Sequence, residues 1–417
     1  MARIEFPEET RKQVEAIGTA DLVLGIAGAV HFEEVRARIV ESASEFLQDA
    51  ATPLKTIVAY AGPHVAPDET NGIAPTSSTV TYLSYPSPPH DPSLGPWAEM
   101  SGAQRSVLAL ASLFQARGCA VLHGDLAALN TPALRLLAAP VLDGTCDLVM
   151  PIYPEGKYDG LINKSLLAPL SRALFSRRVR SPLPFDFCAS TRMIPKLADS
   201  GPLSSQFGAQ LLWPSNVVAM ESGQVRQARI DAAHSLHTEG LELSSVLALL
   251  TGALFQEVEA CAAQWQRARG SQAAEICGTP APLAVDAQPV DARPLIDSFV
   301  LGSRNLEEVW RLVLPPVSLF DLKRLTTLPA EQFRMPDQLW ARIIYDFALA
   351  YRLRRIGRTH LLGALTPIYL GWVASYAQEV AGATVAEADA RVEKLARVFE
   401  ENKPYFVSRW RWPDRTS

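Results

Sequence analysis

The chain has 417 residues, a formal net charge of −5 and a sequence pI near 5.9. Hydrophobic residues make up 48% of it and charged residues 20%, which is typical of a folded, soluble protein. The negative charge argues against a nucleic-acid partner, because proteins of that class present a clustered basic surface. The length is sufficient for two or three domains.

The five cysteines form no C-x-x-C pair, so we interpret them as reduced thiols of a cytoplasmic protein. Residues 1–12 are charged and lack the apolar core of a signal peptide. Residues 360–377 carry no formal charge and approach the length of a membrane-spanning helix. They contain Pro367, two glycines and several polar residues, which favours a buried pair of helices and no membrane partner.

Strand and helix patterns alternate over the first 155 residues. Strands are predicted at 21–26, 56–60, 79–83, 119–122 and 147–152, and helices at 32–47, 101–115 and from residue 131 onward. This alternation predicts an α/β fold with a mostly parallel sheet that is covered by helices on both faces.

After residue 155 the pattern becomes mainly helical. Helices are predicted at 162–175, 243–266, 306–314, 385–401 and from Asp337 onward, with a strand at 225–230 and a stiff aromatic loop at 181–187. Asn305 with Glu308, and further on Asp337, are predicted to cap the helices that they precede.

The stretch 270–294 differs from its neighbours, because it combines small residues and prolines with little periodicity. No strand pattern follows it. We therefore predict an α/β domain at residues 1–268, a linker at 269–294 and an all-α domain at 295–417.

The most informative motif is His123-Gly124-Asp125. It directly follows the strand predicted at 119–122, and Asn130 then opens a helical pattern. In open α/β sheets, ligands bind beyond the carboxyl ends of the strands. The motif therefore predicts a ligand site at this edge of the sheet.

The order of these elements resembles the glycosyltransferases of the GT-A type that are related to mannosylglycerate synthase and glucosyl-3-phosphoglycerate synthase. The segments that carry the resemblance are 157–160 (Lys-Tyr-Asp-Gly), 169–174, 177–187, 340–371 and 399–405. The resemblance implies a Rossmann-like GT-A domain followed by a helical region. It also implies a divalent metal ion, Mn²⁺ or Mg²⁺, and retaining transfer of a hexose from a nucleotide-sugar to a small acidic acceptor such as glycerate.

Three positions match the functional residues of that family. Asp125 matches the second acid of its metal-binding Asp-x-Asp motif, His234 matches a later metal ligand, and Asp186 matches the acid of the acceptor loop. The resemblance implies that Asp125 and His234 hold the metal, with His123 as a third ligand, and that Asp186 acts in catalysis. A site with two imidazoles suits Mn²⁺ better than Mg²⁺.

Lys157 and Arg180 are further candidates for the binding of phosphate or of a carboxylate acceptor, because both lie in basic stretches of the matching segments. Each candidate also has a structural interpretation. Asp125 and Asp186 are residue types that form turns, His123 and His234 are compatible with purely structural roles, and runs of charge usually form a solvated face.

Several positions depart from the family pattern. His123 replaces the first acid of Asp-x-Asp, Pro184 and Phe185 replace two glycines of the acceptor loop, Met100 replaces a lysine, and Gln210 replaces an acid. Glycines allow the backbone to approach a sugar closely, so their loss narrows the space for a sugar beside the acceptor loop.

Two functions from different classes follow from these observations. The first is an active cytoplasmic hexosyltransferase, and the second is a catalytically inactive GT-A-like protein that binds a ligand or regulates a partner. A nucleotidyltransferase is a weaker third interpretation, because residues 27–29 (Ala-Gly-Ala) lack a basic partner for phosphate. The sequence leaves open whether the chain forms a homo-oligomer.

Overall fold

The computed structural model of the protein describes residues 4–27, 41–42, 45–46, 54–61, 80–85, 95–123, 130–200, 211–231, 242–279 and 290–413. The chain divides into two compact units that are interleaved in sequence. The sheet unit comprises Met1–Pro154, Ser181–His237 and Ala273–Pro282. The helical unit comprises Glu155–Arg180, Thr238–Gln272 and Leu283–Ser417. This division differs from the linear boundaries predicted at 268 and 294, because two segments before residue 268 belong to the helical unit.

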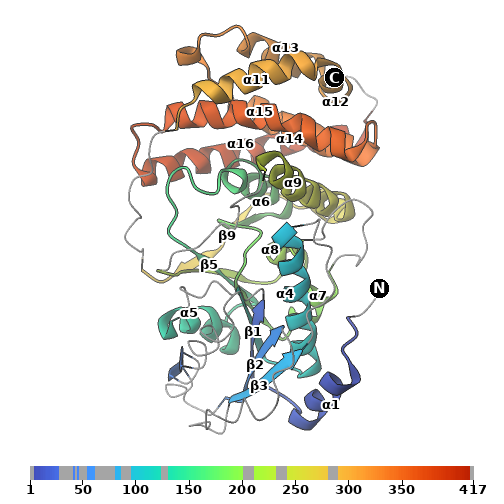
Figure 1. The fold of residues 1–417 in the computed structure, drawn as a ribbon, viewed down its shortest axis with the longest axis vertical. Coiled ribbons are helices and arrows are strands. Elements are labelled where there is room, and N and C mark those ends of the chain that lie inside the picture. The colour runs from blue at the N-terminus through green and yellow to red at the C-terminus, as the bar shows by residue number, and fades with distance from the viewer. Residues whose placement is uncertain are drawn as a thin grey trace. The chain divides into compact units, whose positions relative to one another are not determined.

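The sheet unit contains an eight-stranded, mostly parallel sheet (Figure 1). Its strands are β1 (Leu22–Ala27), β2 (Thr56–Ala61), β3 (Val80–Tyr85), β4 (Gly118–His123), β5 (Leu148–Ile152), β7 (Phe187–Ser190), β8 (Val225–Arg229) and β10 (Glu275–Cys277). Their order in the sheet is β10-β8-β5-β7-β4-β1-β2-β3. Only β7 is antiparallel to its neighbours among these described strands. The predicted fold class is therefore confirmed.

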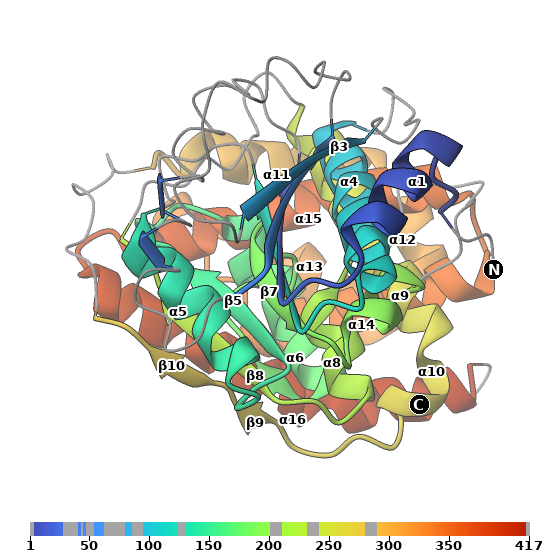
Figure 2. The ribbon, with the colours of Figure 1, turned by 90° about the horizontal axis from the view of Figure 1, so that it is seen from below.

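Helices pack on both faces of this sheet, as the alternation of patterns predicts. They are α1 (Glu8–Ile17), α4 (Gly95–Leu113), α5 (Thr131–Leu142), α7 (Ile194–Ala198) and α8 (Pro214–Met220). The side chain of Asn130 caps α5 by accepting the Ala133 N–H at 2.8 Å. On the opposite face, α4 packs closely against β1, and a Cβ at Gly25 would lie 1.9 Å from Cγ1 of Val107. Gly25 is thus required by the close approach of α4. Figure 2 shows α4 and α5 on opposite sides of the sheet.

Two features of the sheet unit differ from the expectations. β7 follows the loop predicted at 181–187 and was not predicted, because a four-residue strand is too short to show a period of its own. β10 lies in the stretch predicted as a linker and pairs with β8. The helix predicted at 32–47 falls largely outside the described residues, of which 41–42 and 45–46 are helical.

The helical unit is built from long helices. Its elements are the π-helix η3 (Asn163–Leu167), the 3₁₀ turn η4 (Ala330–Gln332), the short strands β6 (Arg177–Arg178) and β9 (Gln272–Ala273), and helices α6 (Ala168–Phe175), α9 (Leu243–Ala260), α10 (Ala262–Trp265), α11 (Arg293–Asn305), α12 (Glu307–Val313), α13 (Pro316–Leu325), α14 (Asp337–Leu353), α15 (Arg358–Glu379) and α16 (Val385–Arg411). α15 packs against α11, α14 and α9, while α16 packs against α14 and α6. The described residues after 290 form helices and turns without a strand, as predicted.

The pair of helices expected at 360–377 is instead the single helix α15, with Pro367 inside it. Gly302 of α11 makes room for this proline, since a Cβ there would lie 2.3 Å from the Pro367 Cβ. Among the described residues, α9 alone has the length and apolar composition of a membrane-spanning helix. Half of it is buried, and core helices of folded proteins commonly have the same composition.

The predicted helix caps were wrong. Asn305 is the last residue of α11, and α12 begins without a side-chain cap. Asp337 makes no cap at α14, and its carboxylate instead pairs with Arg391 at 2.6 Å. A capping box occurs at α16, where Thr384 and Glu387 bond each other's backbone N–H groups.

Candidate functional site

The sheet itself marks the place for a ligand. From β1 the chain proceeds to β2 and β3 on one side and then returns to β4 on the other side. The carboxyl ends of β1 and β4 are level, because Ala27 pairs with His123. This is a topological switch point of a parallel sheet, and such points form the ligand-binding crevice of open α/β folds. His123, the first residue of the His123-Gly124-Asp125 motif, is the last residue of β4 and lies at this point.

Asp186 ties together the ends of two strands beside this point. Its side chain is only 7% exposed. Oδ1 accepts the backbone N–H of His123, the last residue of β4, at 2.5 Å, and Oδ2 accepts the hydroxyl of Tyr153, which directly follows β5. Burial, and then the Asp186 carboxylate, raise the pKa of the Tyr153 phenol well above its usual value. Tyr153 therefore stays protonated and acts as a donor.

Hydrogen bonds from a side chain of α4 hold the loop that precedes Asp186. Gln104 of α4 is fully buried, and its Nε2 donates to the carbonyl oxygens of Phe185 at 3.0 Å and Pro184 at 3.3 Å. The Phe185 ring packs edge-on against the His123 imidazole, with 5.4 Å between ring centroids. The two residues that replace glycines are thus packed parts of a fixed loop.

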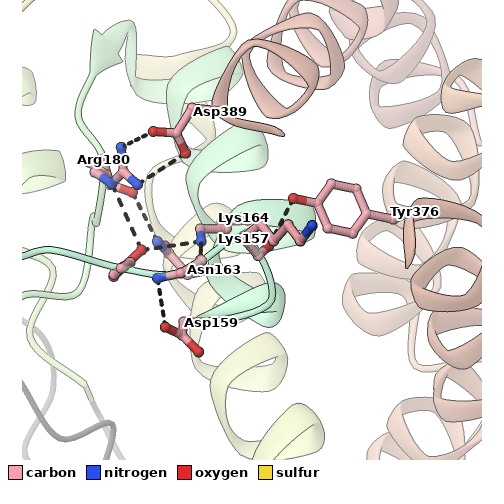
Figure 3. A network of polar contacts seen from close by, with 9 residues as sticks. Lys157, Asp159, Asn163, Lys164, Arg180, Tyr376 and Asp389 are labelled. Carbon is pink, nitrogen blue, oxygen red and sulfur yellow. Dashed lines mark hydrogen bonds and ion pairs between the residues drawn. The ribbon is translucent and has the colours of Figure 1, made fainter. Parts of the chain in front are cut away.

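Lys157 lies in the helical unit, within a network of polar contacts (Figure 3). Its Nζ donates to the carbonyl oxygens of Ala381 and Ala383, at 3.0 and 3.1 Å, in the turn between α15 and α16. The hydroxyl of Tyr376 donates to the Lys157 carbonyl at 2.9 Å. Because Lys157 is 7% exposed, its ammonium group stabilises this turn.

Arg180 belongs to the same network. Its guanidinium forms a bidentate pair with Asp389, at 2.9 and 3.1 Å, and its Nε lies 3.8 Å from Glu155. Lys164 donates to the Gly156 carbonyl at 2.7 Å and lies 3.5 Å from Glu155. Burial lowers the pKa of Lys164, and the Glu155 carboxylate opposes that effect. These cations have partners within their own unit.

The structure therefore brings His123 and Asp186 together and places Lys157 and Arg180 in the other unit. Asp125 and His234 lie outside the described residues, as does Gln210. Among the residues that are described, no three His, Cys, Asp or Glu side chains form a metal-binding group. The metal site of His123, Asp125 and His234 stays a prediction.

Sequence reasoning missed Tyr153 and Gln104. Tyr153 follows a predicted strand directly, so the positional argument that indicated His123 applies to it equally. Gln104 lies three residues before Val107, on the apolar face of a predicted helix. A polar side chain at such a buried position needs a hydrogen-bond partner, and that signal was available in the sequence.

Comparisons with known proteins gave matches only among solved structures. No family model matches the chain, and no curated protein sequence matches it. It is similar to glucosyl-3-phosphoglycerate synthase from Mycobacterium tuberculosis in complex with phosphoglyceric acid, with 18% identity over 62% of this chain and 86% of that chain, and a TM-score of 0.37.

Two further structures show a comparable similarity. One is the same mycobacterial enzyme in complex with Mn²⁺, UDP-glucose and phosphoglyceric acid, with 17% identity, coverage of 62% and 86%, and a TM-score of 0.36. The other is described as a mycobacterial protein, with 15% identity, coverage of 62% and 80%, and a TM-score of 0.36. The enzyme in the first two structures is one that the sequence resembles. The fold class rests on the strand order itself.

Proposed function

We propose that the chain is a metal-dependent, retaining glycosyltransferase of the GT-A type, which transfers a hexose from a nucleotide-sugar to a small acidic acceptor such as glycerate or phosphoglycerate. One observation supports this most. The carboxyl ends of β1 and β4 meet at the point where the strand order reverses, and the chain leaves that point as His123-Gly124-Asp125. Imidazole and carboxylate in this order are a chemically suitable donor set for Mn²⁺.

In this proposal His123, Asp125 and His234 hold the metal ion. A bound divalent ion neutralises the charge that develops on the leaving diphosphate. Asp186 orients the acceptor hydroxyl near the anomeric carbon, and positioning of this kind supplies much of the rate effect.

Specific observations favour the second candidate, an inactive GT-A-like binding or regulatory protein. The Phe185 ring packs on His123, and Met100, which stands where the family has a lysine, is 2% exposed. Lys157 and Arg180 make hydrogen bonds within the helical unit. In this alternative, the switch point binds a nucleotide or a partner without supporting transfer.

Calorimetric titration with UDP-glucose and GDP-mannose, each with and without Mn²⁺, separates the candidates. The transferase predicts Mn²⁺-dependent binding together with glycosylated glycerate or phosphoglycerate when acceptor is added. Asp125→Asn should abolish both, whereas Asp143→Asn should change neither, because Asp143 is an exposed acid at the far end of α5. Binding without product supports the inactive protein. The transferase proposal is abandoned if the wild-type chain binds neither donor.

A further inference from the structure

One corner of the helical unit gathers the carboxyl ends of α9, α14 and α16 with the amino end of α15. Near the end of α16, the Trp410 ring packs against Trp265 of α10, with 5.2 Å between centroids. Arg352 of α14 donates to the Trp410 carbonyl at 2.7 Å and lies 4.4 Å from its ring. Arg358, the first residue of α15, pairs with Glu259 near the end of α9 at 2.7 Å. Figure 2 shows α10 beside the end of α16.

The three segments that meet in this corner contain no acidic residue. They are residues 260–272, 347–360 and 402–413, which directly follow Glu259, Asp346 and Glu401, and together they carry nine lysines and arginines. We call their arginines the basic corner: Arg267, Arg269, Arg352, Arg354, Arg355, Arg358, Arg409 and Arg411. Five of these side chains are exposed, namely Arg267, Arg269, Arg354, Arg355 and Arg411. The corner is thus strongly positive in a chain whose net charge is −5.

Compensation of helix dipoles accounts for only part of this charge. Each helix end is equivalent to about half an elementary charge, so three carboxyl ends and one amino end sum to about one negative charge. Asp346 pairs with Arg409 at 2.8 Å and neutralises one more positive charge. Glu257, in the last turn of α9, is counted as offsetting a second one. If Arg355 and the Arg358–Glu259 pair are left out of the count, six arginines of the basic corner remain. The helix ends and the two carboxylates offset about half of their charge, so about three positive charges are not compensated.

An exposed tryptophan adjoins these arginines. Trp412 directly follows Arg411 and is 60% exposed, whereas Trp410 is buried. Indole rings favour the boundary between lipid headgroups and acyl chains, and arginines near an anionic membrane are attracted to its surface. Single-stranded nucleic acid requires successive exposed rings for base stacking, and in the described segments of this corner Trp412 is the only exposed Phe, Tyr or Trp ring.

We propose that the basic corner binds the surface of a membrane rich in anionic lipids, with the exposed arginines at the headgroups and the Trp412 indole at the interface. This is peripheral binding and requires no spanning helix. No membrane partner was predicted from the sequence, but that prediction considered only whether residues 360–377 span a membrane. Peripheral binding through the basic corner is therefore an additional interaction. The inference is independent of the proposed transferase activity.

The test is flotation of the full chain with vesicles of phosphatidylcholine alone or with about one third phosphatidylserine, at low and physiological salt. The wild-type chain should bind only the anionic vesicles, and more weakly as salt increases. A triple variant carries Arg267→Gln, Arg269→Gln and Arg354→Asn. Asparagine is chosen at 354 because that residue has a φ of 53° and ends α14 in the left-handed region. Each lost arginine lowers the partition coefficient about fivefold, so the triple variant should bind about 100-fold more weakly.

A second triple variant, Arg304→Gln, Arg311→Gln and Lys323→Gln, makes the same change in net charge on α11, α12 and α13. It should bind like the wild type. Brominated lipids should quench the wild-type fluorescence, and Trp412→Ser should remove that quenching. Three results would overturn the proposal: no binding of the wild-type chain to anionic vesicles at physiological salt, equal loss of binding in the two triple variants, or displacement from vesicles by an equal charge concentration of single-stranded RNA.

Discussion

The hydrogen bonds of Asp186 allow a prediction whose size follows from the structure. In Asp186→Asn, the amide oxygen can still accept the His123 N–H, and the amide NH₂ can donate to the Tyr153 oxygen. Both bonds then become neutral. Hydrogen bonds to charged groups contribute about 1.5–3 kcal/mol and neutral ones about 0.5–1.5 kcal/mol. We expect Asp186→Asn to destabilise the sheet unit by about 2 kcal/mol.

Asp186→Ala leaves a buried N–H and a buried hydroxyl without this acceptor, and each such loss costs about 1–3 kcal/mol. The alanine variant should therefore be destabilised by about 4 kcal/mol. Differential scanning calorimetry measures both changes, since 1 kcal/mol shifts Tm by about 2–4 °C for a unit of this size. If Asp186→Asn melts within 1 °C of the wild type, or if the alanine variant melts no lower than the asparagine variant, the carboxylate does not hold the two strand ends together.

Three further predictions concern other described contacts. Gln104→Leu removes both hydrogen bonds to the loop at Pro184 and Phe185, so backbone amide exchange of that loop should accelerate at least tenfold, with unchanged exchange in β2. Thr384→Ala breaks the capping box of α16 and should destabilise the helical unit by about 1 kcal/mol in urea titration, while Thr384→Ser should not. Burial lowers the pKa of Lys403 to about 8. Its unfolded pKa is higher, so the unfolded state binds more protons between these values, and stability should rise as pH increases through that window. Lys403→Met should flatten this rise.

The sequence predicted the parts of the sheet whose signal is local. β1 and β4 are apolar runs buried on both faces, and such runs are visible without knowledge of their partners. β7 is different, since its four residues are ordered by pairing with β4 and β5 on either side. A strand that is stabilised by its neighbours more than by its own pattern cannot be identified from one sequence.

The interleaving of the two units has a similar cause. α6 is buried along nearly its whole length, and Arg172 within it pairs with Glu393 and Glu400 of α16 at 2.6 and 2.9 Å. The partners lie more than 200 residues away in the sequence. No local period reveals that a segment between two strands of the sheet completes the core of a helical unit.

The candidate site combines a feature that the local sequence predicts with a contact that only the tertiary fold determines. The place of His123 at the end of a strand follows from an apolar run that ends in a polar residue. The contact with Asp186 follows from the antiparallel register in which Val121 pairs with Phe187, because that register sets Asp186 opposite Leu122 and next to the His123 N–H. Register depends on the tertiary fold. The resemblance pointed to Asp186, but only the structure explains what its carboxylate does.

The chemistry of that contact bears on the choice between an active and an inactive protein. A buried carboxylate is unfavourable unless hydrogen bonds compensate for its desolvation, as the bonds from His123 and Tyr153 do at Asp186. Asp186 lies beside the switch point, where ligands of open α/β folds bind, and this position favours the active enzyme. If Asp186→Asn keeps donor binding and most of its stability but loses transfer, the carboxylate is there for the acceptor; if it keeps transfer as well, the residue is an anchor and the argument for catalysis rests on Asp125 and His234 alone.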